Sequence, residues 1–393
     1  MKIGLYNDSF PPTIDGVANT VLSYAKFIHK NHDEAIVVTP KYPNVTDDYP
    51  FEVYRYPSMP AFGTIPYRTG NPFLPATLMD LHSKNIDLIH VHSPFVSSLL
   101  ANQQNNFNHK KLPLVLTYHT KYDIDIDKFV PNTKVQKVAK RFVLHNINLA
   151  DEVWTVTDGA GKWLQQTGYN KDYIVMPNGT DFPKGIADKS QIGELKRIHN
   201  INDDEIIFLF VGRMMWYKNI KLILDTISEV SKSNIKFHAF MVGDGTDRPA
   251  IEKYTNDIGI KSLVTFTGAI YDREIVRAYF SLADLFLFPS TYDTSGLVVK
   301  EAAACDCPSL LVKGSCASEC VTDLETGLIA EDNATDCARK IIDAVRAPLL
   351  LMALGKSANE YVYLSWEDAV AKAYERYGVV ADNFKSKHHK KWF

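Results

Sequence analysis

The sequence predicts an α/β protein made of two doubly wound, Rossmann-like domains. Its 393 residues exceed what one hydrophobic core usually organises, which favours two domains of about 200 residues each. Short β-branched and aromatic runs alternate with longer helical ones, as in parallel sheets with helices on both faces. This alternation starts afresh in mid-chain, after a segment rich in Pro, Gly, Asn and Asp at 177–185, which is the strongest structure breaker in the chain.

The strand candidates fall into two series. The first is Lys2–Tyr6, Glu34–Thr39, Leu88–His92, Leu114–Thr117, Glu152–Thr157 and Tyr173–Met176. The second is Ile206–Val211, Lys236–Val242, Val264–Thr267, Leu285–Phe288 and Ser309–Val312. We therefore expect an N-terminal domain over 1–182 and a C-terminal domain over 183–371. Ligands of such sheets bind beyond the carboxyl ends of the strands, so two facing sheets would form one cleft lined by loops that follow strands.

Composition and charge exclude several classes of protein. A hydrophobic content of 46% and a charged content of 23% are ordinary for a soluble protein, and the net charge of −3 gives no support to a nucleic-acid partner. Met1 leads directly into a strand-like segment, and no apolar run reaches the roughly 18 residues of a membrane span. We expect a cytoplasmic protein, or one bound peripherally to the inner face of the cell membrane.

The five cysteines all lie in the last quarter of the chain. They are Cys305, Cys307, Cys316, Cys320 and Cys337. An odd count in a long cytosolic chain argues against a disulfide framework. Four of them could supply thiolates to zinc, but the spacings are not those of a zinc knuckle, and apolar neighbours favour small buried residues.

The most specific segment follows the strand that ends at Phe288. A helix is predicted to open near Ser295 or Gly296, with Thr294 and Ser295 as good N-caps. The backbone N–H groups of Ser295, Gly296 and Leu297, together with the helix dipole, would suit a diphosphate. The glycine has no side chain, so a ligand can approach its backbone closely.

Two carboxylates, Asp293 and Glu301, stand eight residues apart in this segment. They suit hydroxyl recognition, Asp293 for a sugar and Glu301 for a ribose. Taken alone, they are equally well explained as solvated acids near a helix start.

A pair of cations follows the first strand of the second series. Arg213 and Lys218 stand five residues apart in a loop that enters a helix. They could converge on a diphosphate, with Arg213 as a bidentate fork and Lys218 as a point charge, and so stabilise a leaving nucleotide. By themselves they would be read as surface cations.

Two loops of the N-terminal half also follow strands. Gly16 lies in the loop at 7–19, which lacks a GxGxxG fingerprint and so gives no support to a nicotinamide cofactor. Gly243–Gly245 is likewise interpreted only as a strand-end turn. His119 follows the Leu114–Thr117 strand and should reach the cleft, although a lone histidine is more often packed and satisfied. His90 and His92 end a neighbouring strand on the same side.

One acidic repeat has the sequence pattern of a metal site, but we expect another role for it. The run Asp123-Ile-Asp125-Ile-Asp127 contains two overlapping Asp-x-Asp units, a pattern that can hold a divalent cation on a diphosphate. These acids lie in the half of the chain opposite the cations and the helix start that would neutralise the diphosphate. We therefore expect a structural or acceptor-side role and no required metal.

Together these motifs resemble those of glycosyltransferase family four, over nearly the whole chain. Phe288-Pro-Ser, the acid pair at 293 and 301, Gly296-Leu, Glu301-Ala and Ala304-Cys resemble its donor-site signature, and Gly212-Arg-x4-Lys-Asn219 resembles its second element. The chain departs from the family at Asp293, where Glu is usual, at Asp306, where Gly is usual, and over 314–319. The shorter acid puts the identity of the sugar in question more than the class of reaction.

The resemblance implies a GT-B fold and a retaining, metal-independent transfer of a hexose, glucose or galactose, from a UDP-sugar. It implies that His119, Arg213, Lys218 and Asp293 are catalytic, that Gly16 touches the donor phosphates, and that no cofactor beyond the nucleotide sugar is needed. The family route is front-face transfer, and no clear carboxylate nucleophile follows a strand of the first domain. The last helix, within 372–393, is expected to cross back to the first domain.

The N-terminal half resembles members that glycosylate lipid head groups such as diacylglycerol, so we expect a lipid acceptor, such as diacylglycerol or ceramide, and a membrane surface as partners. Three segments fit that surface: a basic, aromatic tail at 385–393, an apolar stripe with cations at 134–143, and an apolar loop at 61–68. Stripes of this kind are usually core, and charged tails are usually solvated. A soluble or polysaccharide-precursor acceptor, a GDP-sugar, an epimerase and a non-catalytic nucleotide-sugar binding protein remain alternatives.

Overall fold

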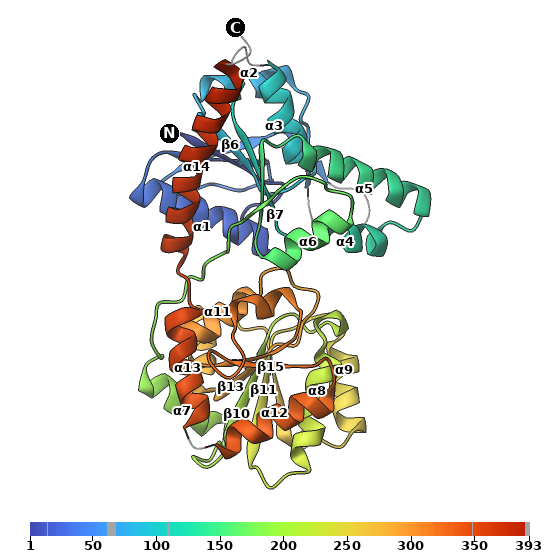
Figure 1. The fold of residues 1–393 in the computed structure, drawn as a ribbon, viewed down its shortest axis with the longest axis vertical. Coiled ribbons are helices and arrows are strands. Elements are labelled where there is room, and N and C mark those ends of the chain that lie inside the picture. The colour runs from blue at the N-terminus through green and yellow to red at the C-terminus, as the bar shows by residue number, and fades with distance from the viewer. Residues whose placement is uncertain (14, 61–67, 108–110, 348, 390–393) are drawn as a thin grey trace. The chain divides into compact units, whose positions relative to one another are not determined.

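The chain folds into two compact units, one of residues 1–178 with 366–393 and one of residues 179–365 (Figure 1). The structure is a computed structural model and describes residues 1–13, 15–60, 68–107, 111–347 and 349–389. Each unit is built on one parallel sheet covered by helices. The predicted fold class, two Rossmann-like α/β domains, is confirmed.

As far as the structure describes the chain, the sheet of the first unit has seven strands in the order β3-β2-β1-β6-β7-β8-β9, with all neighbours parallel. The strands are β1 (Ile3–Tyr6), β2 (Ala35–Pro40), β3 (Glu52–Tyr56), β6 (Leu88–Val91), β7 (Leu114–Tyr118), β8 (Glu152–Thr155) and β9 (Ile174–Val175). The central strands are buried along their whole length, as expected where helices cover both faces. A short antiparallel hairpin, β4 (Ser58–Pro60) with β5 (Arg68–Gly70), lies outside this sheet.

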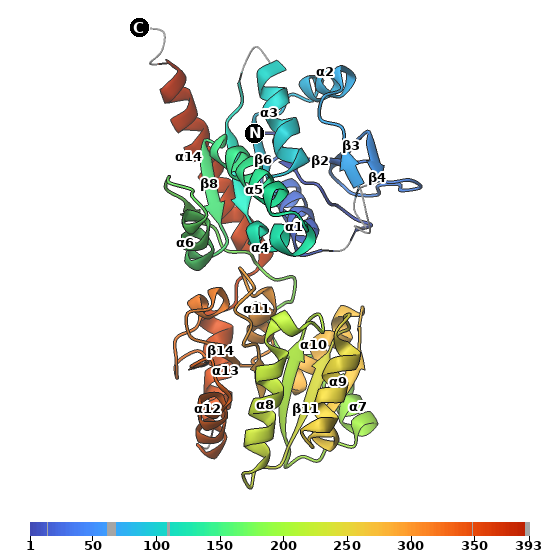
Figure 2. The same cartoon turned by 90° about the vertical axis from the view of Figure 1, so that its right-hand side faces the viewer.

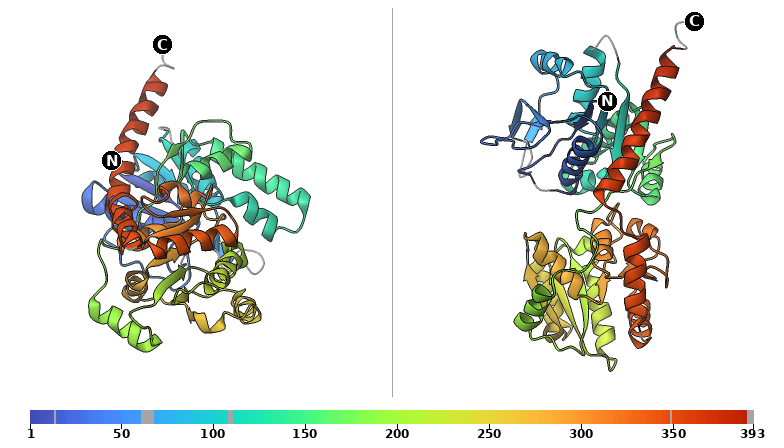
Figure 3. Two further views of the ribbon diagram at one scale, coloured as in Figure 1. Left: turned by 60° about the horizontal axis from the view of Figure 1, so that its bottom comes forward. Right: turned by 90° about the vertical axis from the view of Figure 1, so that its left-hand side faces the viewer.

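Within the described residues, seven helices complete the first unit. They are α1 (Gly16–Asn31), α2 (Pro75–Ser83), α3 (Val96–Phe107), α4 (Tyr122–Phe129), α5 (Thr133–Asn148), α6 (Asp158–Gln166) and α14 (Trp366–His389). The last of these comes from the C-terminal end of the chain and packs against α1; the right-hand view of Figure 3 shows it, in red, running along this unit. It begins at Trp366, a few residues before the predicted crossing segment.

The sheet of the second unit has six strands in the order β12-β11-β10-β13-β14-β15, again all parallel. They are β10 (Ile206–Val211), β11 (Phe237–Val242), β12 (Val264–Gly268), β13 (Leu285–Leu287), β14 (Ser309–Val312) and β15 (Leu328–Ala330). Helices lie on either side of this sheet (Figure 2). They are α7 (Lys189–His199), α8 (Ile220–Ser231), α9 (Arg248–Asp257), α10 (Arg273–Leu282), α11 (Leu297–Ala304), α12 (Ala334–Arg346) and α13 (Leu350–Tyr361).

Each sheet reverses its strand order once. In the first unit the reversal lies between β1 and β6, and in the second between β10 and β13. The two chain connections that leave such neighbouring strands run to opposite faces, and a crevice opens between them at the carboxyl ends. The predicted Arg213–Lys218 and Asp293–Glu301 segments follow β10 and β13, the two strands at the reversal in the second sheet.

Among the described helices, none has the length and apolar character needed to cross a bilayer.

Candidate functional site

The loop after β10 carries the two predicted phosphate-binding cations. Lys218 ends a short 3-10 turn, Trp216–Lys218, and Asn219 follows it in the left-handed conformation, with φ of 59°. The Asn219 amide Nδ2 donates to Asp332 Oδ1 at 2.9 Å and to the Pro289 carbonyl at 3.3 Å. Because Pro289 belongs to the loop after β13, this amide ties the two candidate loops together.

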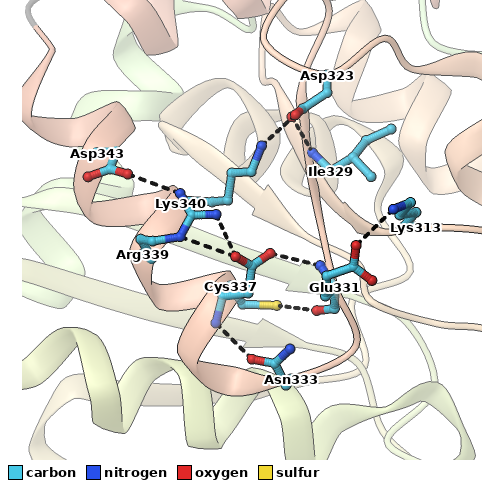
Figure 4. A network of polar contacts seen from close by, with 10 residues as sticks. Lys313, Asp323, Ile329, Glu331, Asn333, Cys337, Arg339, Lys340 and Asp343 are labelled. Atoms are coloured by element: carbon cyan, nitrogen blue, oxygen red, sulfur yellow. Dashed lines mark hydrogen bonds and ion pairs between the residues drawn. The ribbon is translucent and has the colours of Figure 1, made fainter.

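Asp332, which accepts the hydrogen bond from Asn219, lies between β15 and α12, where a network of polar contacts joins the neighbouring residues (Figure 4). Asn333 caps α12, and the Glu331 backbone N–H donates to Asp336 at 2.9 Å. Glu331 also pairs with Lys313 at 2.9 Å, and Lys340 pairs with Asp323. The residues on both sides of Asp332 are therefore fixed, which holds its carboxylate in place for Asn219.

The turn at 243–247 supports the β10 loop from the other side. The Met214 N–H donates to the Asp244 carbonyl at 3.0 Å, and the Trp216 N–H to Asp247 Oδ2 at 2.9 Å. Gly243 has φ of 135°, and a Cβ atom there would lie 1.9 Å from the Gly212 carbonyl oxygen. The interpretation of 243–245 as merely a strand-end turn is too weak, since this turn determines the path of the cation-bearing loop.

Lys218 and Asp293 form an ion pair. The distance from Lys218 Nζ to Asp293 Oδ1 is 2.5 Å, and the two side chains are only 11% and 21% exposed. Ser290 Oγ donates to the other carboxylate oxygen at 2.5 Å. The residues predicted to bind phosphate and sugar thus lie at one point, between β10 and β13.

Arg213 lies in the same loop but is exposed. Within the described part of the chain, no hydrogen bond or ion pair engages its guanidinium. An exposed guanidinium without an ion-pair partner can bind an anionic ligand, because no contact within the protein has to be broken first.

The start of α11 differs from the prediction. The N-cap is Gly296, in the left-handed conformation with φ of 58°, and no side chain caps the helix. Thr294 and Ser295 are therefore not its N-caps, and the helix begins at Leu297. A side chain at 296 would collide with Ala317, since the Cβ–Cβ distance would be 2.8 Å. The glycine thus allows a tight turn that leaves the helix start without a side-chain cap.

Glu301, in the second turn of α11, is bound by a residue that the sequence motifs did not identify. Arg273, the first residue of α10, contacts Glu301 at 2.8 Å and Asp181 at 2.6 Å, and its guanidinium lies 4.2 Å from the ring centre of Phe182. Glu301 is 12% exposed, and burial raises its pKa while Arg273 opposes that rise. A cation at the first position of a helix is unfavourable for the helix dipole, which is a signal that could have drawn attention to Arg273.

His119 lies in the first unit, just after β7, and is largely buried. Its Nε2 is 3.0 Å from His92 Nδ1, and the two rings stack at 5.2 Å. The His90 ring lies beside that of His92, with 4.0 Å between the ring centres, so the three histidines form a row. The two ring nitrogens of His90 contact Thr117 Oγ1 at 2.7 Å and the Tyr377 hydroxyl of α14 at 2.6 Å. Burial lowers the pKa of His119 to about 3 and that of His90 and His92 well below the usual range, so all three rings are neutral near pH 7.

Gly16, also in the first unit, is the first residue of α1. Asp15 caps this helix by accepting from the N–H groups of Val17 and Ala18 at 2.9 and 2.7 Å. A Cβ atom at Gly16 would meet nothing within 4 Å, so the backbone there is open to a ligand.

The acidic repeat at 123–127 lies on α4 and is engaged with protein groups. Asp123 accepts from Trp163 Nε1 at 2.9 Å, and Asp127 pairs with Lys140 at 2.6 Å. In the described ranges no cluster of His, Cys, Asp and Glu side chains has the arrangement of a metal site. The five cysteines are free thiols, and all but Cys320 are buried, which agrees with their interpretation as small buried residues.

The structure thus sorts the predicted residues into two groups. Arg213, Lys218, Asp293, Ser295, Gly296, Leu297 and Glu301 all lie in the second unit, in or just after the loops that follow β10 and β13. Gly16 and His119 lie in the first unit, after β1 and β7. A pocket of about 270 Å³ between α4, α5 and α6 contains no member of either group.

Two family models match the chain. "Glycosyltransferase Family 4" matches residues 14–182, and "Glycosyl transferases group 1" matches residues 191–361. The chain is 25% identical over 315 residues to the alpha-monoglucosyldiacylglycerol synthase of Streptococcus pneumoniae, covering 78% of this chain and 70% of that protein. It is 25% identical over 326 residues to a GDP-mannose-dependent alpha-mannosyltransferase of Corynebacterium glutamicum, covering 79% of this chain and 71% of that one.

The fold also matches solved structures. The HepE protein of Anabaena, crystallised in complex with UDP-glucose, superposes with a TM-score of 0.72 at 17% identity, covering 98% of this chain and 100% of that one. At this identity the likeness establishes the architecture only.

Proposed function

Because this chain belongs to the GT-B glycosyltransferases, with a family 4 domain followed by a group 1 domain, we propose that it moves a hexose from a UDP-sugar to the hydroxyl of a membrane lipid. The hexose is glucose or galactose, and the acceptor is a lipid such as diacylglycerol or ceramide. The observation that carries the proposal is the convergence of Arg213, Lys218, Asp293 and the uncapped start of α11 at the strand-order reversal of the second sheet.

This convergence suits a nucleotide diphosphate. The Arg213 guanidinium and the Lys218 ammonium supply positive charge, and the N–H groups of residues 295–297 supply backbone donors beside it. When the bond between sugar and phosphate breaks, negative charge develops on the leaving diphosphate, and these groups stabilise it. Such positive groups also make the transfer independent of a divalent metal.

The proposed reaction retains the configuration of the sugar. Leaving-group departure creates an oxocarbenium-like sugar, the acceptor oxygen attacks the face that the phosphate leaves, and a phosphate oxygen takes the acceptor proton. A double displacement would instead need a free carboxylate nucleophile. Asp8, the acid that follows β1, accepts from Ser93 Oγ and from the N–H and Oγ of Ser97, so both of its oxygens are hydrogen-bonded to protein groups.

Several residues then have assigned roles. Asp293 accepts hydrogen bonds from hydroxyls of the transferred sugar, and Glu301 accepts them from hydroxyls of the ribose. The Gly16 N–H donates to a donor phosphate. His119, neutral at physiological pH because burial lowers its pKa, contacts the sugar. The sugar therefore meets a neutral hydrogen-bonding group and not an imidazolium.

The nature of the acceptor rests on the relatives. The S. pneumoniae protein is named for glucosylation of diacylglycerol, which supports a lipid acceptor here. The C. glutamicum protein is named for GDP-mannose, which favours mannose transfer from GDP-mannose as the second candidate function.

A donor panel distinguishes these functions. Full-length protein is incubated with UDP-glucose, UDP-galactose or GDP-mannose and a cell lipid extract, and products are identified by mass and by the anomeric NMR signal. We expect UDP release that depends on added lipid, with one glycolipid product of retained configuration. Lipid-dependent GDP release would establish the second candidate, nucleotide release with an altered free sugar would indicate epimerisation, and binding without release would indicate a non-catalytic protein.

A lipid acceptor requires access to a membrane, so we also propose peripheral attachment to the inner face of the cell membrane. Two of the segments predicted to serve it, the loop at 61–67 and residues 390–393 of the tail, lie outside the described residues. Flotation of the chain with vesicles, with and without residues 385–393, tests the tail. Equal flotation would remove the tail from the proposal.

A further inference from the structure

Helix α5 of the first unit exposes a stripe of apolar side chains. Val135, Val138 and Phe142 are 52%, 65% and 37% exposed. Their spacing of i, i+3 and i+7 places them on one side of the helix. Such a stripe is usually buried in a core, so its exposure here requires a reason.

A second stripe, made of cations, runs beside the first. Lys134, Lys137 and Arg141 repeat the same spacing, displaced by one residue, and all three are exposed. The 16 residues of α5 contain four Lys or Arg and no acid, in a chain whose net charge is −3. The fourth cation, Lys140, pairs with Asp127 of α4, whereas no ion pair engages the three stripe cations among the described side chains.

The helix that carries these stripes is well anchored. Val143 and Ile147 on its other side are buried in the core of the unit, and Asn146 Nδ2 donates to the Pro94 carbonyl at 2.8 Å. Asn132 caps its start by accepting from the N–H groups of Lys134 and Val135. Figure 1 shows α5 reaching outward from the sheet with α4 beside it. The two stripes are therefore held in place on a rigid, projecting element.

We propose that the paired stripes of α5 form the surface by which this protein docks on an anionic lipid bilayer. An apolar strip flanked by Lys and Arg matches a membrane interface, where the apolar side chains enter the acyl boundary and the cations face lipid phosphates. The inference rests on the proposed lipid acceptor, because docking would bring the enzyme to its substrate. An acidic protein partner would use the cations, but it would give no role to an adjacent strip of three apolar side chains.

Flotation of the full-length protein tests this surface. The vesicles are phosphatidylcholine alone or phosphatidylcholine with phosphatidylglycerol, each at low and high salt. One variant removes the charges (Lys134→Gln, Lys137→Gln, Arg141→Gln), and another removes the apolar strip (Val135→Ser, Val138→Ser, Phe142→Ser). The control, Lys189→Gln with Ile198→Ser, changes an exposed cation and an exposed apolar residue on α7 of the other unit.

The wild type and the control are expected to float with the anionic vesicles and to detach at high salt. Each cation near an anionic surface strengthens binding roughly fivefold, so the charge variant should bind about a hundredfold more weakly. The apolar variant should lose binding to the anionic vesicles already at low salt, with an unchanged circular dichroism spectrum. Vesicle binding by both variants that equals the wild type, or no binding by the wild type, would overturn the proposal.

Transfer to an acceptor dispersed in detergent separates this inference from the proposed function. We expect the α5 variants to keep wild-type transfer in detergent and to lose it on vesicles. A wild type that binds vesicles through α5 but transfers no sugar to lipid would refute the lipid-acceptor function and leave the docking surface standing. Equal transfer on vesicles by the wild type and the α5 variants would refute the docking surface and leave the function standing.

Discussion

At the scale of single residues, each acid of the predicted donor signature is paired with a cation. Asp293 is held by Lys218 and Glu301 by Arg273. Truncating one partner of a buried pair leaves the other charge uncompensated, so these pairs should be sensitive to substitution. The Arg273 guanidinium also opposes the rise that burial causes in the pKa of Glu301, and an ionised carboxylate accepts hydrogen bonds from hydroxyls most strongly.

Lys218→Ala should lower turnover by about a hundredfold or more, because one preorganised positive group is lost from the leaving diphosphate. The matched control is Lys221→Ala, three residues along in α8, whose ammonium pairs with Asp225 at the surface. Steady-state rates with the preferred donor measure both, and circular dichroism checks the fold. Near-normal turnover of the Lys218 variant would count against the site, as would a similar result for Glu301→Ala.

Arg273→Met should make donor binding dependent on pH. Burial raises the pKa of Glu301 and Arg273 opposes this, so removing the guanidinium raises the pKa further. A carboxylate with a raised pKa loses its charge as pH falls through that pKa, and donor affinity should fall with it. Calorimetric titration with UDP from weakly alkaline to weakly acidic pH would reveal the loss.

Two further variants show whether this effect arises from the charge at 273. Arg273→Lys should keep donor affinity independent of pH. Asp181→Asn, which removes the exposed partner of the same guanidinium, should change little. A uniform, pH-independent weakening in all three variants would mean that Arg273 has only a structural role.

The histidine row should make the first unit less stable in acid. His119 keeps a pKa of about 3 when folded, against 6.5 as its ordinary value, so between these values the unfolded chain binds the extra proton. The free energy of unfolding then falls as pH drops below about 6.5, by up to about 1.4 kcal/mol per pH unit for this histidine. Urea unfolding of the wild type and of His119→Asn across this range should give a shallower pH slope in the variant; equal slopes would contradict the burial. Burial raises the pKa of Asp8, so this group makes the folded chain more stable as pH falls, opposite to the histidines. Asp8 is present in both proteins, so the difference in slope between wild type and variant reports on His119.

At the scale of elements, the β10 loop takes its path from the turn at 243–247. Gly243→Ala would place a methyl group 1.9 Å from the Gly212 carbonyl oxygen, at a φ of 135° that only glycine adopts readily. We expect a loss of about 3 kcal/mol or more in unfolding free energy, together with weaker UDP binding. Gly193→Ala, inside α7 with nothing within 4 Å, should be neutral or slightly stabilising. Normal UDP binding by the Gly243 variant would show that the turn does not control the site.

Elements with a clear hydrophobic pattern could be predicted, and irregular ones could not. Buried strands such as β10 lie where the β-branched and aromatic runs indicated, at Ile206–Val211. The strands β3, β4, β5 and β15 were not predicted, because they are short or have half-exposed side chains that give no continuous apolar run. The start of α11 was misassigned because good capping residues at 294 and 295 precede a left-handed glycine, and the loop geometry overrides the local preference.

The residues of the site divide in the same way. Lys218, Asp293 and Glu301 were predicted because their segments follow strands and resemble the motifs of glycosyltransferase family four; their spacing alone would fit surface charges. Arg273 was not, because it meets Glu301 only through packing between α10 and α11, across 28 residues of sequence. Similarly, the exposure of Val138 on α5 depends on which side of the helix meets the sheet, and an apolar stripe at helical spacing predicts burial equally well.

At the scale of the whole molecule, one chain supplies two parallel sheets, each with a single reversal of strand order. The residues predicted to bind the donor cluster at the reversal of the second sheet, whereas Gly16 and His119 follow strands of the first. The last helix, α14, returns to the first unit and places Tyr377 against His90, so the chain termini share one unit. The central claim is that the donor diphosphate binds between β10 and β13.

A crystal structure of the full chain soaked with UDP-glucose tests that claim most directly. We predict that the two phosphates lie at the carboxyl ends of β10 and β13, within hydrogen-bonding distance of Lys218 and Arg213 and of the backbone N–H groups at 295–297, with the ribose at Glu301. Phosphates bound at any other place on the chain, with these groups unoccupied, would contradict the account.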